Sequence, residues 1–279
     1  MKYMRIELTV LTASKEIKDS EIVVIGQGIP MAAGAIAKQT HAPTAIILTE
    51  AGMVDINAFQ NLEDVGDPGC TRGFSYSIDL FDVFTTIVNR EYADACILGA
   101  AQIDKYGNIN VTVVGNYHNI TGRKDFKLSG SGGSNEFAGH CNRTIYTMIS
   151  GVFVNKLDYM TSPGWLNGGD SRKKAGLRGG PSALITTCGL FRFEDVSKEM
   201  YLAGIFPQTT VESIREMVPW ELKTAEDFGM NIVKITPPKL EELDILRRFE
   251  PFFGIGGHEG RRLEAQALPV YYETGRPND

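Results

Sequence analysis

The first fifty residues alternate between two kinds of hydrophobic pattern. Apolar residues recur at helical intervals over 4–17, which predicts a helix. The β-branched run 21–25 stops at Gly26, and Pro30 then begins an alanine-rich segment, because proline fits the first helical turn. A second apolar run covers 45–49. Strand, glycine turn, helix and strand in this order predict a βαβ unit with parallel strands that are buried on both faces.

Less regular patterns follow. We expect Ser77 to cap a helix that reaches Tyr92, and 95–98 to form another buried strand. Close-set apolar runs predict antiparallel or mixed strands at 111–114, 144–149, 183–187, 190–193 and 201–206, and late helices at 209–217 and 238–249. The fold class predicted is therefore α/β, with an open, mostly parallel sheet flanked by helices and mixed strands in the second half. Residues 1–253 are expected to form one domain, followed by a tail, 254–279, of unassigned role.

Composition and charge exclude several classes of protein. Glycine provides 30 of the 279 residues, about 11% where roughly 7% is usual, but without a collagen period. A net charge of −6 argues against a nucleic-acid-binding surface. The chain lacks an apolar stretch long enough for a signal or a membrane span, so we expect a cytoplasmic protein without membrane contact. The cysteines form no CxxC pair and the histidines are scattered, so no metal site is predicted.

Glu50 is the first candidate for chemistry. It directly follows the apolar run 45–49, and ligands of open α/β sheets bind beyond the carboxyl ends of the strands. A charged group at the margin of a core is unfavourable unless it has partners. Gly52, just beyond it, would let backbone or ligand approach closely. The alternative is that Glu50 is a partly exposed loop residue without a functional role.

A second glycine element is the loop Ser129-Gly-Ser-Gly-Gly-Ser134, followed by Asn135. Its consecutive backbone N–H groups can bind an anion or a carbonyl oxygen that becomes negative in a transition state. A flexible linker is the competing interpretation. The pair Gly26 and Gly28 also invites a dinucleotide-binding interpretation, but the GxGxxG spacing is absent because the next glycine is Gly34.

Five motifs taken together resemble a known family. They are Gly26-Gln-Gly-Ile-Pro30, Thr49-Glu-Ala-Gly-Met-Val-Asp55, Gly99-Ala-Ala-Gln-Ile-Asp-Lys-Tyr-Gly-Asn108, Ser129-Gly-Ser-Gly-Gly-Ser-Asn135 and Lys156-Leu-Asp-Tyr-Met-Thr-Ser-Pro-Gly-Trp165. In this order and spacing they resemble the β subunits of family I coenzyme A transferases of the glutaconate type, over about residues 5–250. The tail departs from the family pattern.

The resemblance implies a CoA-transferase-type fold, a homologous α subunit in a hetero-oligomer, and a ping-pong reaction. The catalytic glutamate of the family matches Glu50, which would carry CoA as a thioester between an acyl-CoA and a free acid, expected to be dicarboxylic. The other site residues implied are Gly26, Gly28, Gly52, Gln102, Gly130, Gly132, Gly133 and Asn135, with Gln102 orienting Glu50 or the thioester oxygen. Coenzyme A is a substrate moiety, and no permanently bound cofactor is implied.

Two alternatives stay open at this point. Some relatives in steroid breakdown resemble these transferases but open a ring in a CoA ester by hydrolysis, and their glutamate at this position is displaced, whereas Glu50 is retained here. A non-catalytic nucleotide-binding α/β module would make Glu50 incidental and leave the glycine loop unexplained.

Overall fold

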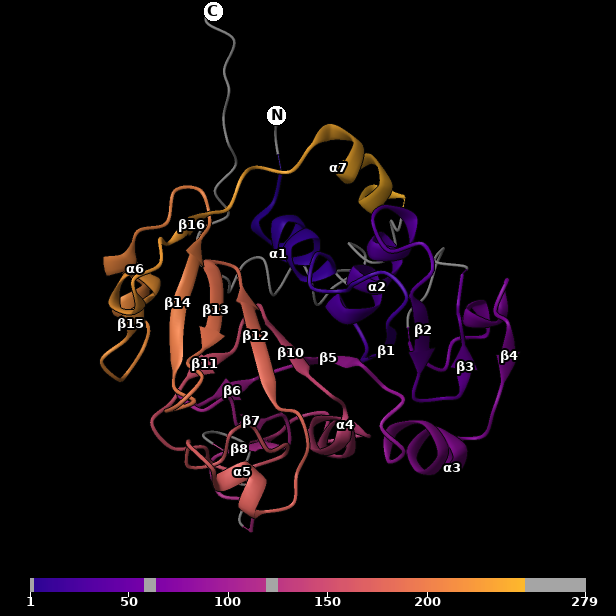
Figure 1. The fold of residues 1–279 in the computed structure, drawn as a ribbon, viewed down its shortest axis with the longest axis horizontal. Coiled ribbons are helices and arrows are strands. Elements are labelled where there is room, and N and C mark those ends of the chain that lie inside the picture. The colour runs from indigo at the N-terminus through magenta and orange to yellow at the C-terminus, as the bar shows by residue number, and fades with distance from the viewer. Residues whose placement is uncertain (1–2, 58–63, 119–124, 249–279) are drawn as a thin grey trace, which may run out of the picture.

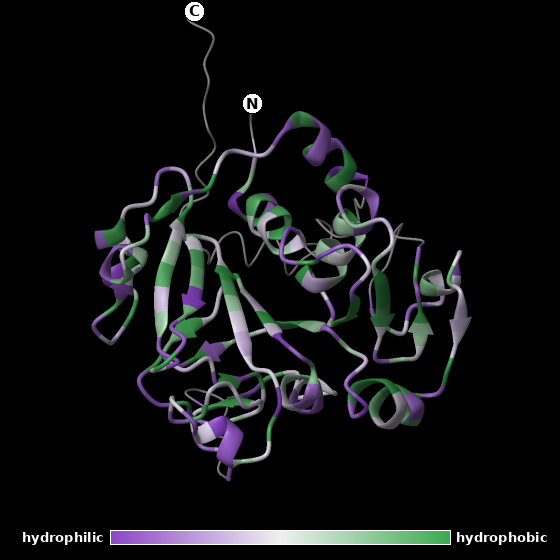
Figure 2. Cartoon of the chain, viewed as in Figure 1, coloured by the Kyte–Doolittle hydropathy of each residue, from purple (hydrophilic) through white to green (hydrophobic). Residues whose placement is uncertain are grey.

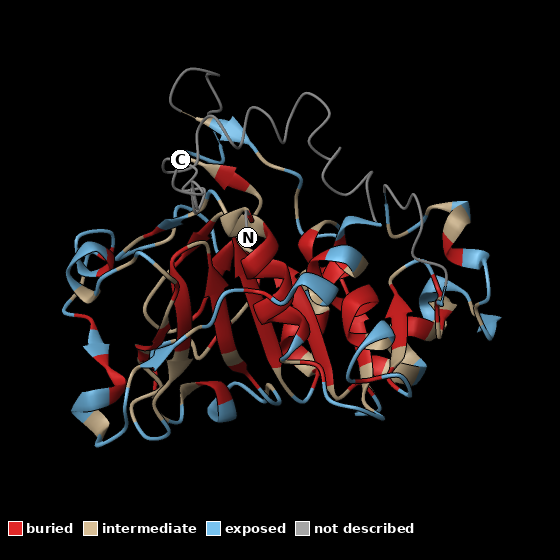
Figure 3. Ribbon diagram, turned by 90° about the horizontal axis from the view of Figure 1, so that it is seen from above, coloured by how far each residue is buried: buried red, intermediate tan, exposed pale blue. Residues whose placement is uncertain are grey.

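Among residues 3–57, 64–118 and 125–248, which the computed structural model describes, eleven strands form one sheet (Figure 1). Five of these strands lie side by side and are parallel, in the order β12 (Pro181–Thr186), β10 (Thr144–Met148), β5 (Ala95–Gly99), β1 (Ile22–Ile25) and β2 (Ile46–Thr49). They are almost wholly buried, as expected when helices cover both faces (Figure 3). The predicted βαβ unit and the parallel sheet are confirmed.

Shorter strands extend both edges of this parallel centre. Beyond β2, the antiparallel strands β3 (Met53–Val54) and β4 (Tyr76–Ser77) complete one edge. Beyond β12 come the antiparallel strands β13 (Gly189–Phe193) and β14 (Met200–Ile205), and β14 pairs in parallel with both β15 (Lys223–Thr224) and β16 (Val233–Lys234). The prediction of mixed strands in the second half is therefore confirmed.

Helices cover the sheet in two layers (Figure 1). One layer contains α1 (Arg5–Ser14), α2 (Ile29–Gln39) and α7 (Leu240–Arg247), and the other contains α3 (Leu80–Asp82), the π-helical turn η2 (Val83–Val88) and α4 (Ser134–His140). Each layer has its own apolar core against the sheet. Figure 2 shows hydrophobic residues along the strands, whereas in α7 they alternate with hydrophilic ones.

Gly34 lies where α2 packs on the sheet. A Cβ at this position would lie 3.4 Å from the Cγ2 atoms of both Ile25 and Ile47, at the short end of ordinary contact, so α2 packs closely on β1 and β2 here. The helix begins after Gly28, whose φ of 84° is accessible to glycine at little cost, and Pro30 lies in its first turn. The glycine turn thus fixes where the chain leaves β1.

A smaller lobe lies below the sheet in Figure 1. It contains a three-stranded sheet of β6 (Gln102–Ile103), β7 (Ile109–Asn110) and β11 (Val152–Phe153), and the strand pair β8 (Val113–Val114) and β9 (Phe126–Lys127), all within the described ranges. The remaining short elements are α5 (Ser171–Lys174), α6 (Val211–Arg215), η1 (Pro68–Thr71) and η3 (Ala225–Phe228).

Two local predictions were wrong. Ser77 belongs to β4, and Asp79 caps the following helix, since its Oδ1 accepts the N–H of Asp82 at 2.8 Å. The predicted strand 111–114 is interrupted, because the Oδ1 atom of Asn110 accepts the N–H groups of Thr112 at 2.9 Å and Val113 at 3.3 Å and so turns the chain between β7 and β8. The predicted tail, 254–279, lies outside the described residues.

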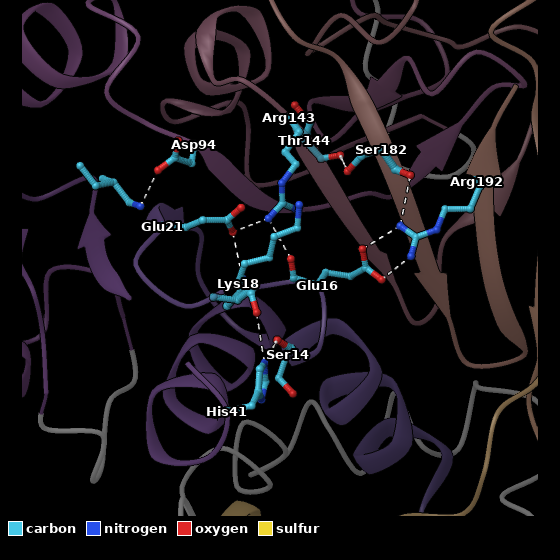
Figure 4. A network of polar contacts seen from close by, with 12 residues as sticks. Ser14, Glu16, Lys18, Glu21, His41, Asp94, Arg143, Thr144, Ser182 and Arg192 are labelled. Carbon is cyan, nitrogen blue, oxygen red and sulfur yellow. Dashed lines mark hydrogen bonds and ion pairs between the residues drawn. The ribbon is translucent and has the colours of Figure 1, made fainter. Parts of the chain in front are cut away.

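Ion pairs gather at the amino ends of the parallel strands (Figure 4). Arg143, just before β10, pairs with Glu21, just before β1, and also donates to the carbonyl of Glu16 at 2.9 Å. Arg192 of β13 binds Glu16 through two hydrogen bonds of 2.7 and 2.6 Å. Asp94, before β5, accepts the N–H of Ile22 at 2.9 Å. These contacts join strands at the amino edge of the sheet, and none of them involves the carboxyl edge.

Candidate active site

The carboxyl ends of β1 and β2 bring two of the predicted residues together. Ile25 pairs with Thr49, so Gly26 and Glu50 follow at neighbouring strand ends. On the other side of β1, the N–H of Gly26 donates to the carbonyl of Ile97 in β5 at 3.0 Å. The chain leaves β1 toward β2, whereas β5 lies on the opposite side, so this edge is a topological switch point. Ligands of open α/β sheets bind at such points.

Glu50 also meets the predicted glycine loop. Its Oε2 accepts a hydrogen bond of 3.1 Å from the N–H of Gly133, and a Cβ at Gly132 would lie 3.2 Å from the same oxygen. Gly132 has a φ of 47°, which favours glycine. The loop and the carboxylate, 83 positions apart in the chain, therefore form one site. Glu50 is partly buried, and none of the described Lys, Arg or His side chains forms an ion pair with it.

Gly133 is held against aromatic rings. Phe84 of η2 and Phe137 of α4 stack with ring centroids 5.1 Å apart. A Cβ at Gly133 would lie 2.6 Å from Cζ of Phe84 and 2.9 Å from Cε2 of Phe137, distances that real contacts do not reach. Gly133 has an ordinary φ of −84°, so the space beside the rings, and not backbone conformation, requires glycine here.

The other predicted glycines lie in different surroundings. Gly28 and Gly130 both have positive φ, and a Cβ at either would meet no atom within 4 Å. Both are open on the side where a side chain would stand. A Cβ at Gly52, by contrast, would lie 1.9 Å from the carbonyl oxygen of Ile78, so the group that approaches Gly52 closely is the chain itself.

Gln102 forms its hydrogen bonds with Asp158 and Asn110. Its Nε2 donates to Oδ2 of Asp158 at 2.8 Å, and its Oε1 accepts from Nδ2 of Asn110 at 2.7 Å and from the N–H of Asp158 at 3.2 Å. The Gln102 side chain, on β6, thus binds Asn110 of β7 and Asp158, and it forms no hydrogen bond with Glu50. Asn135, in the first turn of α4, is exposed.

Two residues that support the loop were missed by the sequence reasoning. Ser162, inside the fifth motif, is fully buried, and its Oγ lies 2.9 Å from Oγ of Ser134. Arg172, which lies in no motif, is 1% exposed and binds the carboxyl end of α4. The position of Ser162 within a quoted motif was a signal, whereas no local pattern distinguishes a buried arginine from an exposed one.

The sequence matches a known family over most of its length. Residues 9–217 match the coenzyme A transferase family. The chain belongs to this family. The β subunit of glutaconate CoA-transferase from Acidaminococcus fermentans is 33% identical over 257 residues, which cover 87% of this chain and 93% of the relative. The β subunit of 3-oxoadipate CoA-transferase from Pseudomonas knackmussii is 30% identical over 251 residues, 89% of this chain and 94% of the relative.

Solved structures agree with this assignment to the CoA-transferases. The crystal structure of glutaconate coenzyme A-transferase from Acidaminococcus fermentans superposes with a TM-score of 0.80 at 30% identity, covering 88% of this chain and 94% of that one. The decarboxylase AibA/AibB superposes with a TM-score of 0.71 at 21% identity over 88% of this chain and 95% of that one, which shows the shared fold alone. The resemblance of the five motifs to β subunits of the glutaconate type is confirmed.

Two further observations concern metal ions and membranes. Across the described residues, no group of three or more His, Cys, Asp or Glu side chains is arranged to hold a metal ion. None of the helices in the described parts of the chain combines the length and the apolar character of a membrane span.

Proposed function

We propose that this chain is the catalytic β subunit of a CoA-transferase that moves CoA from an acyl-CoA to a free carboxylic acid through a glutamyl-CoA thioester on Glu50. The observation that carries the proposal is the contact between Glu50 and Gly133 at the carboxyl ends of the strands. It joins a carboxylate nucleophile to a backbone donor that is already in place.

The proposed first half-reaction has two steps, and in each step one bond forms and one bond breaks. Oε1 of Glu50 attacks the thioester carbonyl carbon, a C–O bond forms, and the C–S bond breaks to give a mixed anhydride and CoA thiolate. The thiolate then attacks the Glu50 carboxyl carbon, a C–S bond forms, and the bond from that carbon to the bridging Oε1 breaks, so the donor acid leaves as a carboxylate that carries this oxygen. The acceptor carboxylate repeats these steps in reverse. No proton or external energy source is consumed, because the anhydride is about as activated as the thioester.

The geometry supports a specific role for Gly133 in this scheme. Its N–H already binds Oε2, the oxygen that stays double-bonded when Oε1 becomes part of the anhydride. When the thiolate attacks the Glu50 carbon, the negative charge develops on Oε2. A fixed donor at such an oxygen typically contributes about a hundredfold or more in rate. Gly130 and Gly132 carry no side chain at two positions of the loop, which leaves their backbone accessible to the incoming thioester.

The substrate and the partner are also proposed. Glutaconate and 3-oxoadipate, for which the two relatives are named, are both dicarboxylic acids, which favours a dicarboxylate as one substrate here. Both relatives are named as one subunit of a larger enzyme, which favours a hetero-oligomer with a homologous α subunit. We propose that CoA is bound only as a substrate moiety, that no cofactor is permanently held, and that the enzyme acts in the cytoplasm.

The decisive test is a covalent adduct. The chain, purified together with its partner subunit, is incubated with glutaryl-CoA or acetyl-CoA without an acceptor acid. Peptide mass spectrometry is expected to find the mass of CoA, less water, on the peptide that contains Glu50, and to find none in Glu50→Gln.

Other outcomes separate the alternatives. Consumption of a cyclic CoA ester, without an adduct and without an acceptor acid, would indicate hydrolysis of the ring-opening type. Thermal stabilisation by NAD, with neither an adduct nor consumption, would indicate a nucleotide-binding module.

The need for a partner gives a second expectation. Alone, the chain is expected to show no CoA exchange between acyl-CoA and a carboxylate, and activity should return when the α subunit is added. Light scattering before and after mixing measures the assembly, and exchange is followed by chromatography of the CoA esters. Full exchange by the isolated chain would contradict the two-subunit proposal, while leaving the role of Glu50 intact.

A further inference from the structure

The short helix α4 is fastened at its amino end to a segment outside the predicted site. Oγ of Ser134, the first residue of α4, lies 2.9 Å from Oγ of Ser162, which is fully buried. Gly133, whose N–H binds Glu50, immediately precedes Ser134. Any shift of Ser134 therefore moves the donor that faces the nucleophile.

Arg172 fastens the other end of α4 to the same segment. Its Nη1 donates to the carbonyls of Pro163 at 3.0 Å and Gly164 at 2.8 Å, and its Nη2 donates to those of Ala138 and, at 3.3 Å, Gly139. The last two are carbonyls at the carboxyl end of α4. One planar guanidinium thus bonds to both segments at once, which a lysine ammonium cannot reproduce in the same geometry.

The segment 162–164 is itself fixed to the small lobe. The N–H of Ile109 donates to the carbonyl of Ser162 at 3.1 Å, and the N–H of Gly164 donates to Oδ1 of Asn108 at 2.8 Å. This segment is therefore a stationary reference for α4. Because α4 rises about 1.5 Å per residue, Ser134 and Gly139 are only about 7.5 Å apart along the helix axis. A short, rigid element of this kind transmits a displacement at one end to the other.

If Arg172 served only to hold α4 in place, its buried charge would carry a high desolvation free energy. Arg172 is 1% exposed, and among the described residues it has no carboxylate partner, so its charge is compensated by carbonyl oxygens and by the ring of Trp165, whose centroid lies 5.9 Å from its Cζ. Burial lowers the pKa of its guanidinium accordingly. Desolvation of an ion costs several kcal/mol, and apolar packing in its place is often at least as stable. A geometric role accounts for the charge better than stability does.

We infer that Arg172 and Ser162 are positioning residues of the Glu50 site, which fix both ends of α4 so that the N–H of Gly133 meets Oε2 of Glu50. Neither residue forms a hydrogen bond with Glu50. The inference rests on the proposed function, since it concerns the rate at which Glu50 becomes a thioester.

The test is a single-turnover measurement of glutamyl-CoA formation on the complex with its partner, using glutaryl-CoA or acetyl-CoA. Arg172→Lys keeps the charge and loses the fork, and Ser162→Ala removes only the hydroxyl contact. We expect glutamyl-CoA formation to slow by about tenfold to a hundredfold in Arg172→Lys and about threefold to tenfold in Ser162→Ala, since small misplacements of reacting groups have effects of this size. The half-saturating acyl-CoA concentration should change by less than about threefold, because binding groups are not removed.

Arg192→Met is the matched control. Arg192 is also an arginine that bonds a backbone carbonyl, but it is only partly buried and lies at the amino edge of the sheet, where it binds Glu16 (Figure 4). This variant is expected to lower the melting temperature and leave the rate per folded molecule unchanged. If the role of Arg172 were merely structural, Arg172→Lys would likewise lower the melting temperature and leave the rate per folded molecule unchanged.

The outcomes are distinguishable. Slower adduct formation with a nearly unchanged half-saturating concentration in Ser162→Ala and Arg172→Lys, but not in Arg192→Met, supports the inference. Wild-type rates per folded molecule in Ser162→Ala and Arg172→Lys overturn it, and if Arg172→Lys does not fold, Ser162→Ala decides alone. Absence of an adduct in the wild type would instead contradict the proposed function.

Discussion

Glu50→Gln is expected to reduce CoA exchange by at least about a thousandfold, the largest loss of any single substitution in the site, because it removes the proposed covalent nucleophile. The amide oxygen of glutamine can still accept the N–H of Gly133, so the loop should keep its position. Among the described residues no cation pairs with Glu50, so removing its charge leaves no buried partner uncompensated. The melting temperature is expected to stay close to that of the wild type.

Glu50→Asp separates charge from position. It keeps a carboxylate but withdraws it by one methylene from the Gly133 N–H, so we expect intermediate activity, roughly a hundredfold below the wild type. Steady-state exchange between acyl-CoA and a labelled carboxylate measures all three proteins, with thermal unfolding as the control for folding. Exchange by Glu50→Gln within about tenfold of the wild type would rule out the glutamyl-CoA intermediate.

The parallel core could be predicted from the sequence because its strands are short, almost wholly apolar runs that end at turn residues. The runs 21–25 and 45–49 match β1 and β2 to within a residue. The prediction failed where a side chain determines the backbone conformation. The Oδ1 atom of Asn110 accepts the N–H groups of Thr112 and Val113, and these hydrogen bonds interrupt a β-branched run. Asp79 replaced Ser77 as a cap for the same reason, since both residue types can accept the orphan N–H.

Within the candidate site, residues at strand ends and in loops could be located from the sequence, whereas their roles are not tested by the structure. Glu50 and the glycine loop were expected to face one pocket, and the structure brings Glu50 together with Gly132 and Gly133. The catalytic role of Glu50 and the binding roles of the other predicted site residues stay predictions, which are those of Gly26, Gly28, Gly52, Gln102, Gly130, Gly132, Gly133 and Asn135. The partners of Gln102 depend on which strands of the small lobe pair, which no local pattern specifies.

The motifs that carried the resemblance are linked to one another in the fold. The third and fifth meet where Asn108 accepts the N–H group of Gly164. The fifth and fourth meet at Ser162 and Ser134, and the fourth and second meet at Gly133 and Glu50. Most of these contacts between motifs therefore support the position of Glu50 indirectly, and only the contact between Gly133 and Glu50 involves the proposed nucleophile.

Gly133→Ala is expected to slow exchange by about a hundredfold, the scale of a lost oxyanion donor. The alanine Cβ would stand 2.6 Å from the ring of Phe84, so either the stacked rings or the backbone at position 133 must move. Overpacking of this kind typically costs about 1–3 kcal/mol of stability. Phe137 is almost fully buried and cannot yield easily, which makes displacement of the Gly133 N–H the expected result.

Gly139→Ala is the control, because it adds the same methyl group inside α4, whereas Gly133 is the residue that precedes this helix. Its Cβ would lie 3.7 Å from Cδ2 of Leu177, an ordinary contact, and alanine is the better helix former, so stability and activity should be retained. Adding Phe84→Leu to Gly133→Ala makes room for the methyl group and should recover part of the lost rate. Exchange kinetics and melting temperatures of the four proteins decide the matter: if Gly133→Ala exchanges CoA at the wild-type rate, the Gly133 N–H does not stabilise the charge that develops on Glu50.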